Sequence, residues 1–216
     1  MVNQIAIIIP TYNEEKNIER LIKNIKHHVG NVLIIVVDDS DNNKISLIIK
    51  KKKLGILYFN RGKKAGRGSA ILFGLKKILV NKKIKVFIEM DADFSHNPAE
   101  LKRNINFFLN NSLDLLIGSR YLKKSKIINW SLSRRIFSFL ANFSAKILLQ
   151  IPITDFTNGY RIYSRRSVKK IIKSCGKVGD GFIILSEILV QLYLNNFKID
   201  EIHSKFVNRV RGESSI

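Results

Sequence analysis

Four of the chain's scarce carboxylates lie where two apolar runs end. The chain has 17 Asp and Glu residues against 38 Lys and Arg residues, so acidic side chains are a minority. The four are Asp38 and Asp39, after residues 32–37, and Asp91 and Asp93, after residues 86–90. Ligands of open α/β sheets bind beyond the carboxyl ends of the strands. The spacing therefore predicts two acidic corners at one edge of a sheet.

Asp91 and Asp93 are two positions apart, which lets both carboxylates address one centre. Mg²⁺ and Mn²⁺ take hard oxygen ligands and bridge protein carboxylates to substrate phosphates. The alternative is structural, because Asp93 or Ser95 could cap the helix that follows. The spacing by itself leaves both interpretations open.

The strands that end at these carboxylates belong to an alternating pattern. Runs that are nearly continuous in Val, Ile and Leu predict parallel strands buried on both faces. The predicted strands cover 5–9, 32–37, 56–59, 86–90 and 113–117, and the predicted helices cover 14–28, 41–53, 65–80 and 99–110. This alternation indicates an α/β layer with right-handed crossovers.

After Arg120 the pattern changes, although no linker divides the chain. We expect a single domain over 1–216, with one half over 1–120 and a second half over 121–216. The second half predicts an amphipathic helix over 130–151, a turn and strand over 156–164, an apolar helix over 182–194 and a strand over 199–207. The segment 130–151 fits a helix lying in a membrane interface, an ordinary helix that packs on the core, or a mixture with one stripe on the sheet and another on lipid.

Composition narrows the function classes. The net charge of +21 indicates an anionic partner, namely nucleic acid, a lipid surface or a phosphorylated small molecule, unless it reflects biased composition alone. A hydrophobic share of 45% excludes global disorder. The single cysteine, Cys175, excludes an internal disulfide and fits a reducing compartment. No apolar run approaches the roughly 20 residues that span a bilayer, and we expect no signal peptide.

Several other binding motifs are missing from the sequence. There is no P-loop pattern, and the pair Gly66 and Gly68 is followed by Ile71 where a dinucleotide fingerprint needs a small residue. The four histidines are scattered and Cys175 stands alone, so no zinc cluster is predicted. The aromatic residues follow helical stripes and do not alternate with arginine on a sheet face, which argues against nucleic acid as the partner.

Six segments, in order along the chain, resemble the motifs of one family. They are 9–15 (IPTYNEE), 37–40 (VDDS), 91–96 (DADFSH) with Pro98, 118–121 (GSRY) with 129–134 (NWSLSR), 155–161 (DFTNGYR) and 206–214 (FVNRVRGES). Together they resemble the dolichyl-phosphate (polyprenyl-phosphate) mannosyltransferases, which are inverting glycosyltransferases of the GT-A fold. The resemblance implies a mostly parallel, Rossmann-like α/β sheet flanked by helices, with C-terminal amphipathic interface helices. It also implies that 1–120 is the nucleotide-sugar-binding half and 121–216 the acceptor and membrane-interface half.

The same resemblance implies a reaction and its setting. A hexose, mannose from GDP-mannose, would move with inversion to polyprenyl phosphate, with Mg²⁺ or Mn²⁺ as cofactor. The enzyme would be peripheral on the cytoplasmic face of a membrane, with a possible membrane-anchoring subunit and no nucleic acid partner. Rival hypotheses are the same fold with UDP-glucose or another acceptor, a basic nucleic-acid-binding protein, and an inactive membrane subunit.

The resemblance also implies a role for each matching residue. The donor would be bound by Pro10, Tyr12, Glu14, Asp39, Asp91, Ala92, Asp93, Ser95, Arg120 and Arg209. Asp91 and Asp93 would hold the metal, and Arg120 and Arg134 the acceptor phosphate. The catalytic residues would then be Asp93, Arg120 and Arg134.

The chain departs from the family pattern at two places, and one further loop resembles a loop of the family. The turn after Asp39 is short, and Ser215 stands where the family usually has lysine. Lys63, Lys64 and Arg67, with two glycines between and after them, resemble a loop of the family that we expect on the nucleotide side.

Overall fold

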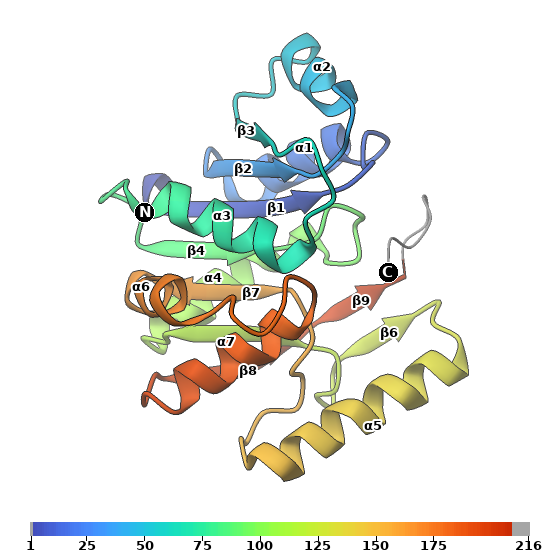
Figure 1. Ribbon diagram of the computed structural model, residues 1–216, viewed down its shortest axis with the longest axis vertical. Coiled ribbons are helices and arrows are strands. Elements are labelled where there is room, and N and C mark those ends of the chain that lie inside the picture. The colour runs from blue at the N-terminus through green and yellow to red at the C-terminus, as the bar shows by residue number, and fades with distance from the viewer. Residues whose placement is uncertain (1, 209–216) are drawn as a thin grey trace.

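A seven-stranded sheet forms the centre of the molecule in the computed structural model, which describes residues 2–208 (Figure 1). Its strand order is β3-β2-β1-β4-β7-β5-β8. The strands are β1 (Ile5–Thr11), β2 (Leu33–Asp38), β3 (Leu57–Asn60), β4 (Val86–Glu89), β5 (Leu115–Ser119), β7 (Arg161–Ser164) and β8 (Ile199–His203). β7 runs antiparallel to β4 and β5, and the other pairs of this sheet are parallel. The expected mostly parallel α/β architecture is confirmed.

Helices cover both faces of the sheet, which explains why the strand sequences are apolar throughout. α1 (Ile18–Val29), α2 (Lys44–Lys51) and α4 (Leu101–Asn110) contribute to the core on one face. α3 (Arg67–Leu79), α6 (Arg165–Ser174) and α7 (Ile183–Tyr193) contribute to the core on the other face. Successive side chains of a strand point to opposite faces. In β1, accordingly, Ile7 enters the first core and Ile8 the second.

Three differences from the predicted elements have physical reasons. The helix expected from residue 14 begins at Ile18, because the preceding residues form the loop beyond β1. The helix α6 was not predicted; it begins after Ser164, whose hydroxyl accepts a hydrogen bond from the backbone N–H of Ser167. The strand expected over 199–207 is broken at Ser204, where the chain leaves the main sheet.

The broken strand continues as β9 (Lys205–Val207), which pairs with β6 (Lys126–Ile128) in a separate two-stranded sheet. The backbone N–H of Ser204 donates to Ser119 O, and that of Lys205 donates to the Glu100 carboxylate, so the break is held on both sides. As a result, Phe206 lies beside the turn that follows β4, in an isolated bridge with His96.

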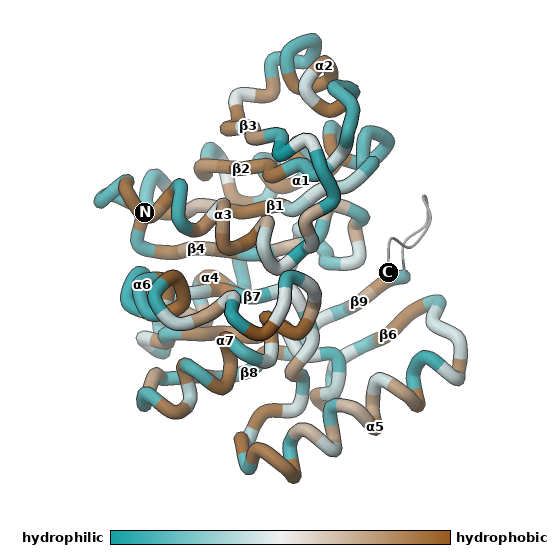
Figure 2. Tube along the Cα trace, viewed as in Figure 1, coloured by the Kyte–Doolittle hydropathy of each residue, from teal (hydrophilic) through white to brown (hydrophobic). Residues whose placement is uncertain are grey.

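Helix α5 (Leu132–Leu149) is the exception to the packing of the other helices. It lies beyond β6, at the lower edge of Figure 1, and Figure 2 shows hydrophobic residues along it. Asn142 is its one buried residue. The interpretation of this segment as an ordinary core-packing helix is therefore wrong, because no large apolar side chain of α5 is buried and only Ala145 packs against the second core.

Candidate active site

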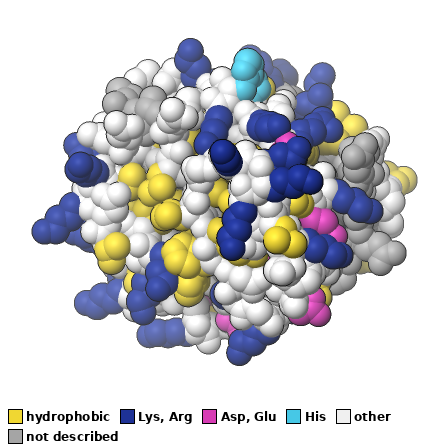
Figure 3. Space-filling view, turned by 90° about the horizontal axis from the view of Figure 1, so that it is seen from above, with side chains coloured by type: hydrophobic (Ala, Val, Ile, Leu, Met, Phe, Trp, Pro, Cys, Tyr) yellow, Lys and Arg dark blue, Asp and Glu magenta, His cyan; other side chains and the backbone are white. Residues whose placement is uncertain are grey.

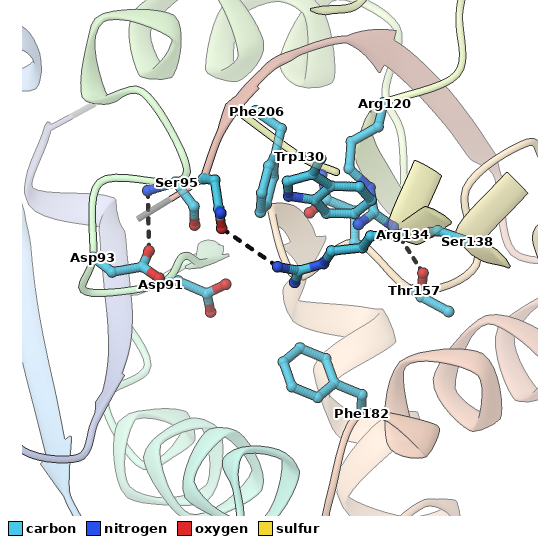
Figure 4. A pocket seen from close by; sticks show the side chains of 13 residues that line it. Asp91, Asp93, Ser95, Arg120, Trp130, Arg134, Ser138, Thr157, Phe182 and Phe206 are labelled. Carbon is cyan, nitrogen blue, oxygen red and sulfur yellow. Dashed lines mark hydrogen bonds between the residues drawn. The ribbon is translucent and has the colours of Figure 1, made fainter. Parts of the chain in front are cut away.

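Two pockets open at the carboxyl edge of the sheet and share Asp91, Asp93 and Phe182. The strand-side pocket, of about 480 Å³, lies beyond β1, β2 and β4 and against the start of α3. The helix-side pocket, of about 470 Å³, lies between the Asp91–Asp93 turn and helix α5. Figure 4 shows the helix-side pocket, with Phe182 facing Arg134 across it. A molecule bound in each pocket would meet the other at the two aspartates.

Most of the residues expected to bind a donor meet in the strand-side pocket. Its lining includes Pro10, Tyr12, Glu14, Asp39, Asp91, Ala92 and Asp93. Three separate strand ends supply them, which is the arrangement expected for ligand sites of α/β sheets. The pocket also contains Lys64, whose Nζ lies 5.3 Å from the centre of the Tyr12 ring. The aromatic ring, the cations and the carboxylates together suit a nucleotide with its phosphates.

Asp39 has a structural task in addition to its place in the pocket. Arg61 donates to both of its carboxylate oxygens, from Nε at 2.6 Å and from Nη2 at 2.7 Å. The backbone N–H of Ala65 donates to the same carboxylate at 2.9 Å. Asp39 therefore ties the loop between β3 and α3, which carries Lys64 and Gly66, to the end of β2.

The turn after β4 is held by a buried histidine. The backbone N–H of Asp91 donates to His96 Nδ1 at 3.0 Å, so the other ring nitrogen, Nε2, carries the proton. That nitrogen lies 3.0 Å from Asn158 Oδ1, to which it donates. From the sequence, His96 was noted as part of the segment 91–96 and as one of four scattered histidines. Its role in the turn was not predicted, because it depends on a contact 62 residues away.

The helix-cap interpretation of the aspartates is wrong. Asn97 caps the helical turn that follows, by accepting a hydrogen bond from the backbone N–H of Ala99. Asp93 accepts a hydrogen bond from the backbone N–H of Ser95 at 3.0 Å, within its own turn. Both Asp91 and Asp93 line both pockets.

Arg67, at the start of α3, lies between two acidic side chains. Its Nη1 is 2.6 Å from Glu89 Oε1 and its Nη2 is 2.7 Å from Asp91 Oδ1. Burial works against the charge of this guanidinium, but the charges of Asp91 and Glu89 outweigh it and raise the pKa of Arg67 above its ordinary value. The resemblance to a nucleotide-side loop had suggested a place near the donor, and the structure places Arg67 in the strand-side pocket.

The helix-side pocket is built around stacked cations. The indole of Trp130 lies near two guanidinium groups, with its centre 5.3 Å from Arg120 and 4.4 Å from Arg134 (Figure 4). Arg120 is buried and forms a two-pronged ion pair with Asp155, from Nε at 2.8 Å and Nη2 at 2.7 Å. Arg134 is exposed and donates to Asn208 Oδ1 at 3.4 Å. Arginine suits phosphate because its planar fork binds oxygens in pairs.

The ion pair of Arg120 and Asp155 perturbs both groups. Burial acts to lower the pKa of Arg120, but the charge of Asp155 more than offsets this and the pKa is raised. Burial acts to raise the pKa of Asp155, but Arg120 and the backbone N–H donors lower it overall. Both groups are therefore charged at neutral pH.

The remaining expected residues divide between the two pockets. Ser95 and Arg120, expected to bind the donor, lie in the helix-side pocket, together with Arg134. Arg209 lies outside the described residues. Sequence reasoning did not single out Phe182 or Asn158 for the site, because both reach it only when α7 and β7 pack beside β4 and α3.

Helix α5 presents its polar stripe to the protein and its apolar surface to the outside. Its only buried or half-buried positions are Ser138, Asn142 and Ala145, which are spaced as one helical stripe. Tyr121 donates to the Ser138 hydroxyl at 2.6 Å, and Asn142 accepts from the backbone N–H of Phe156 at 2.7 Å. The large exposed side chains are Leu132, Ile136, Phe137, Phe139, Leu140, Phe143, Ile147, Leu148 and Leu149.

This arrangement is the reverse of an ordinary surface helix, which buries its apolar stripe. Among the described residues, no helix combines the length and the apolarity that crossing a membrane requires. α5 carries three cations, Arg134, Arg135 and Lys146, and no acidic residue. A basic helix with a broad apolar surface has the features of one that lies in a membrane interface.

A divalent cation fits the chemistry of the Asp91–Asp93 turn. The two carboxylates supply hard oxygen ligands at the junction of the pockets. Within residues 2–208 no group of three or more His, Cys, Asp or Glu side chains could hold a metal alone. Mg²⁺ commonly uses one or two protein carboxylates, with water and substrate phosphates as the other ligands, so the pair is sufficient.

The face seen from above shows how the cations outside these pockets are distributed. Figure 3 shows lysine and arginine side chains spread over the face seen from above, with few acidic ones between them. On that face the positive charge is therefore distributed and not gathered in one patch (Figure 3). It marks no second binding site on that face.

Comparison with known proteins identifies the family. Residues 6–172 match the model of the Glycosyl transferase family 2. The chain is 33% identical over 214 residues to the polyprenol monophosphomannose synthase of Mycolicibacterium smegmatis, covering 97% of this chain and 80% of that protein. It is 32% identical over 205 residues to an uncharacterized protein of Methanocaldococcus jannaschii, covering 95% and 82%.

Solved structures agree on the fold. Glucosyl-3-phosphoglycerate synthase from Mycobacterium tuberculosis, in complex with Mn²⁺, UDP and glucosyl-3-phosphoglycerate, superposes with a TM-score of 0.70 at 17% identity, over 98% of this chain and 73% of that one. At this identity the likeness concerns the fold alone. The family match and the related synthase confirm the resemblance noted in the sequence. The chain is a glycosyltransferase of the GT-A fold and belongs to the Glycosyl transferase family 2.

Proposed function

We propose that this enzyme transfers mannose from GDP-mannose to a polyprenyl phosphate, with inversion and with Mg²⁺ or Mn²⁺. The observation that carries the proposal is the pair of pockets that meet at Asp91 and Asp93. One pocket suits a nucleotide diphosphate, and the other offers Arg120 and Arg134 to a phosphate. The name of the related synthase supplies the sugar and the lipid class.

The donor would lie in the strand-side pocket. Pro10, Tyr12, Glu14, Asp39 and Lys64 surround the place for the nucleoside, and Asp91, Ala92 and Asp93 the place for the diphosphate. A metal ion held by Asp91 and Asp93 would neutralise charge that develops on the departing diphosphate. Ser95 holds Asp93 through its backbone N–H and so keeps the turn in shape.

The acceptor phosphate would lie in the helix-side pocket, between Arg120 and Arg134. A phosphate monoester has a second pKa of about 6, so at neutral pH it is largely dianionic and already a nucleophile. No strong general base is needed, and the protein contributes positioning and charge neutralisation. Attack on the anomeric carbon from the helix side, opposite the departing diphosphate, would invert the configuration.

Helix α5 would place this pocket at a lipid surface. Its outer face would insert Phe137, Phe143 and Leu148 among acyl chains, with Arg135 and Lys146 near the headgroups. Each cation close to an anionic membrane contributes about 1 kcal/mol. Because Arg134 and Ser138 line the pocket from the same helix, the polyprenyl phosphate would reach the site from the membrane. We propose the cytoplasmic face as the location.

Transfer of labelled mannose from GDP-mannose to a short polyprenyl phosphate, by purified protein with Mn²⁺, tests the proposal. We expect a product that depends on the metal and is lost in excess chelator. A parallel assay with UDP-glucose tests the rival donor. Activity only with UDP-glucose would contradict GDP-mannose as the donor and would leave the proposed site unchanged. Binding of DNA or RNA without sugar transfer from any donor would contradict the proposal.

A further inference from the structure

The proposed transfer gives no task to Arg67, the cation built into the strand-side pocket. The side chain of Arg67 is 11% exposed, and that of Glu89 beside it is fully buried. Its Nη1 lies 2.6 Å from Glu89, and its Nε donates to Asp91 Oδ1 at 2.8 Å. A buried guanidinium between two carboxylates is costly to desolvate and requires good geometry.

Other contacts hold Arg67 in place. Its Nη2 donates to the backbone oxygen of Gly159 at 3.3 Å, and its guanidinium lies 5.2 Å from the centre of the Phe182 ring. A Cβ atom added to Gly159 would collide with the guanidinium, so the chain approaches it as closely as a glycine allows. The second oxygen of Glu89 accepts the Tyr163 hydroxyl at 2.8 Å.

The charges of this cluster bear on both ligands of the pocket. Glu89, Asp91 and Asp93 carry three negative charges, and Arg67 carries one positive charge against two of them. A divalent ion at Asp91 would have to share that carboxylate with Arg67. A diphosphate close to Asp91 would be repelled by the carboxylate, and Arg67 reduces that repulsion.

We propose that Arg67 is a resident cation of the diphosphate site that shares Asp91 with the divalent ion. It weakens the binding of the metal to the free enzyme, and it supports binding of the nucleoside diphosphate when no metal is bound. Glu89 limits how strongly Arg67 affects the binding of the metal and of the diphosphate, because its carboxylate partly neutralises the charge of Arg67. The inference rests on the proposed donor site at Asp91 and Asp93.

Two substitutions are expected to move metal and nucleotide binding in opposite directions. Arg67→Met removes the competing cation, so the Kd for Mn²⁺, measured by electron paramagnetic resonance without nucleotide, should fall about fivefold or more. The Kd for GDP in excess EDTA, measured by calorimetry, should rise by a similar factor. Glu89→Gln removes one of the two carboxylates paired with Arg67, so the guanidinium interacts more strongly with Asp91. In this variant the Kd for Mn²⁺ should therefore rise and the Kd for GDP in EDTA should fall.

A control on the same helix separates this effect from net charge. Lys76→Met removes an exposed cation from the far end of α3 and should leave both Kd values within about twofold. Thermal unfolding of each variant checks the fold, since Arg67→Met leaves the buried Glu89 without its partner. If that variant does not fold, Glu89→Gln retains the cation and still tests the inference through weaker Mn²⁺ binding and tighter GDP binding.

The outcomes separate the inference from the proposed function. Wild-type protein that binds Mn²⁺ and GDP, with folded variants that leave both Kd values unchanged or shift them in the same direction, would overturn the role of Arg67 alone. Wild-type protein that binds neither Mn²⁺ nor GDP nor UDP would overturn the donor site itself, and the inference with it. Opposite shifts in the two variants would support both.

Discussion

The carboxyl edge of the sheet and helix α5 treat polar groups in opposite ways. At the sheet edge, buried charges meet counter-charges at hydrogen-bonding distance, as in the pairs Arg61–Asp39, Arg67–Asp91 and Arg120–Asp155. Along α5, the contact with the protein is made by Ser138, Asn142 and Ala145, and the aromatic side chains face outward. The sheet edge is organised for charged ligands away from water.

Helix α5 exposes its large apolar side chains, which the proposed function assigns to a lipid surface. An outer face of nine large apolar side chains would cost solubility in an isolated domain. The two regions meet at the helix-side pocket, whose lining includes Arg134 and Ser138 of α5 and Asp91 and Asp93 of the turn after β4. In the proposed function, α5 would hold the lipid that carries the acceptor phosphate, and the sheet edge would hold the water-soluble donor.

The largest expected effect concerns stability at the sheet edge. Asp155→Ala leaves the buried Arg120 without its counter-charge, and we expect the free energy of unfolding to fall by about 3–5 kcal/mol in urea denaturation. Asp200→Ala, at an exposed carboxylate on β8, is the matched control and should cost less than about 0.5 kcal/mol. Equal losses in the two variants would contradict the account of the sheet edge as a set of matched buried charges.

The same pair predicts a dependence of stability on pH. The folded-state pKa of Asp155 is lowered from its ordinary value of 3.8, so its contribution is fully present above that value. It is lost as the pH falls below 3.8 through the lowered folded-state pKa. The difference in unfolding free energy between wild type and Asp155→Ala should therefore shrink in acid and stay constant from about pH 5 to 7.

A second large effect concerns chemistry at the junction of the pockets. Asp93→Asn keeps the shape of the turn and removes the charge of one of the two proposed metal ligands, so we expect kcat/KM for sugar transfer to fall about 10²–10³-fold. Asp41→Asn, an exposed carboxylate in the loop after β2, should leave it within about twofold. Transfer by Asp93→Asn at the wild-type rate would remove the two aspartates from the proposed mechanism.

A third effect separates the outer face of α5 from the protein core. The double change Phe137→Ser and Leu148→Ser should lower partition to vesicles of anionic lipid by about 10²-fold, since each large apolar side chain contributes about 1.5–3 kcal/mol on transfer. The free energy of unfolding should change by less than about 0.5 kcal/mol, because both side chains are exposed. A large loss of stability would show that this face packs on the protein.

The smallest expected effect concerns the acceptor. Arg134→Ala removes an exposed guanidinium, and we expect the KM for polyprenyl phosphate to rise about tenfold with little change in the KM for GDP-mannose. Arg135→Ala is the matched control, because its guanidinium donates to the backbone oxygen of Ile127 and does not line the pocket. A rise in the donor KM alone would move Arg134 to the other pocket.

Much of the fold and part of the candidate site could be predicted from the sequence. Continuous apolar runs predicted the central strands, and four aspartates after two of them predicted the acidic edge of the sheet. The helix 130–151 was expected to be amphipathic, and the ordered motifs indicated the family. These features are local, because hydrophobic spacing and residue type carry them whatever the rest of the chain does.

The partners of those residues could not be predicted. Arg67 reaches Asp91 across 24 residues, Arg120 reaches Asp155 across 35, and Asn158 reaches His96 across 62. These contacts depend on the insertion of β7 between β4 and β5 and on the position of Arg67, the first residue of α3, against Glu89 of β4. The break at Ser204 is of the same kind, because it depends on Ser119 and Glu100 in other elements.

Helix α5 shows most directly which features follow from the sequence and which follow from the tertiary structure. Its sequence determined that one helix would carry aromatic, aliphatic and basic residues together. Only the tertiary structure decided which side faces the protein, because the hydrogen bonds from Tyr121 to Ser138 and from Phe156 to Asn142 hold the small polar stripe inward. Hydrophobic periodicity records that a helix has an apolar side, whereas long-range packing decides whether that side meets the core or the surroundings.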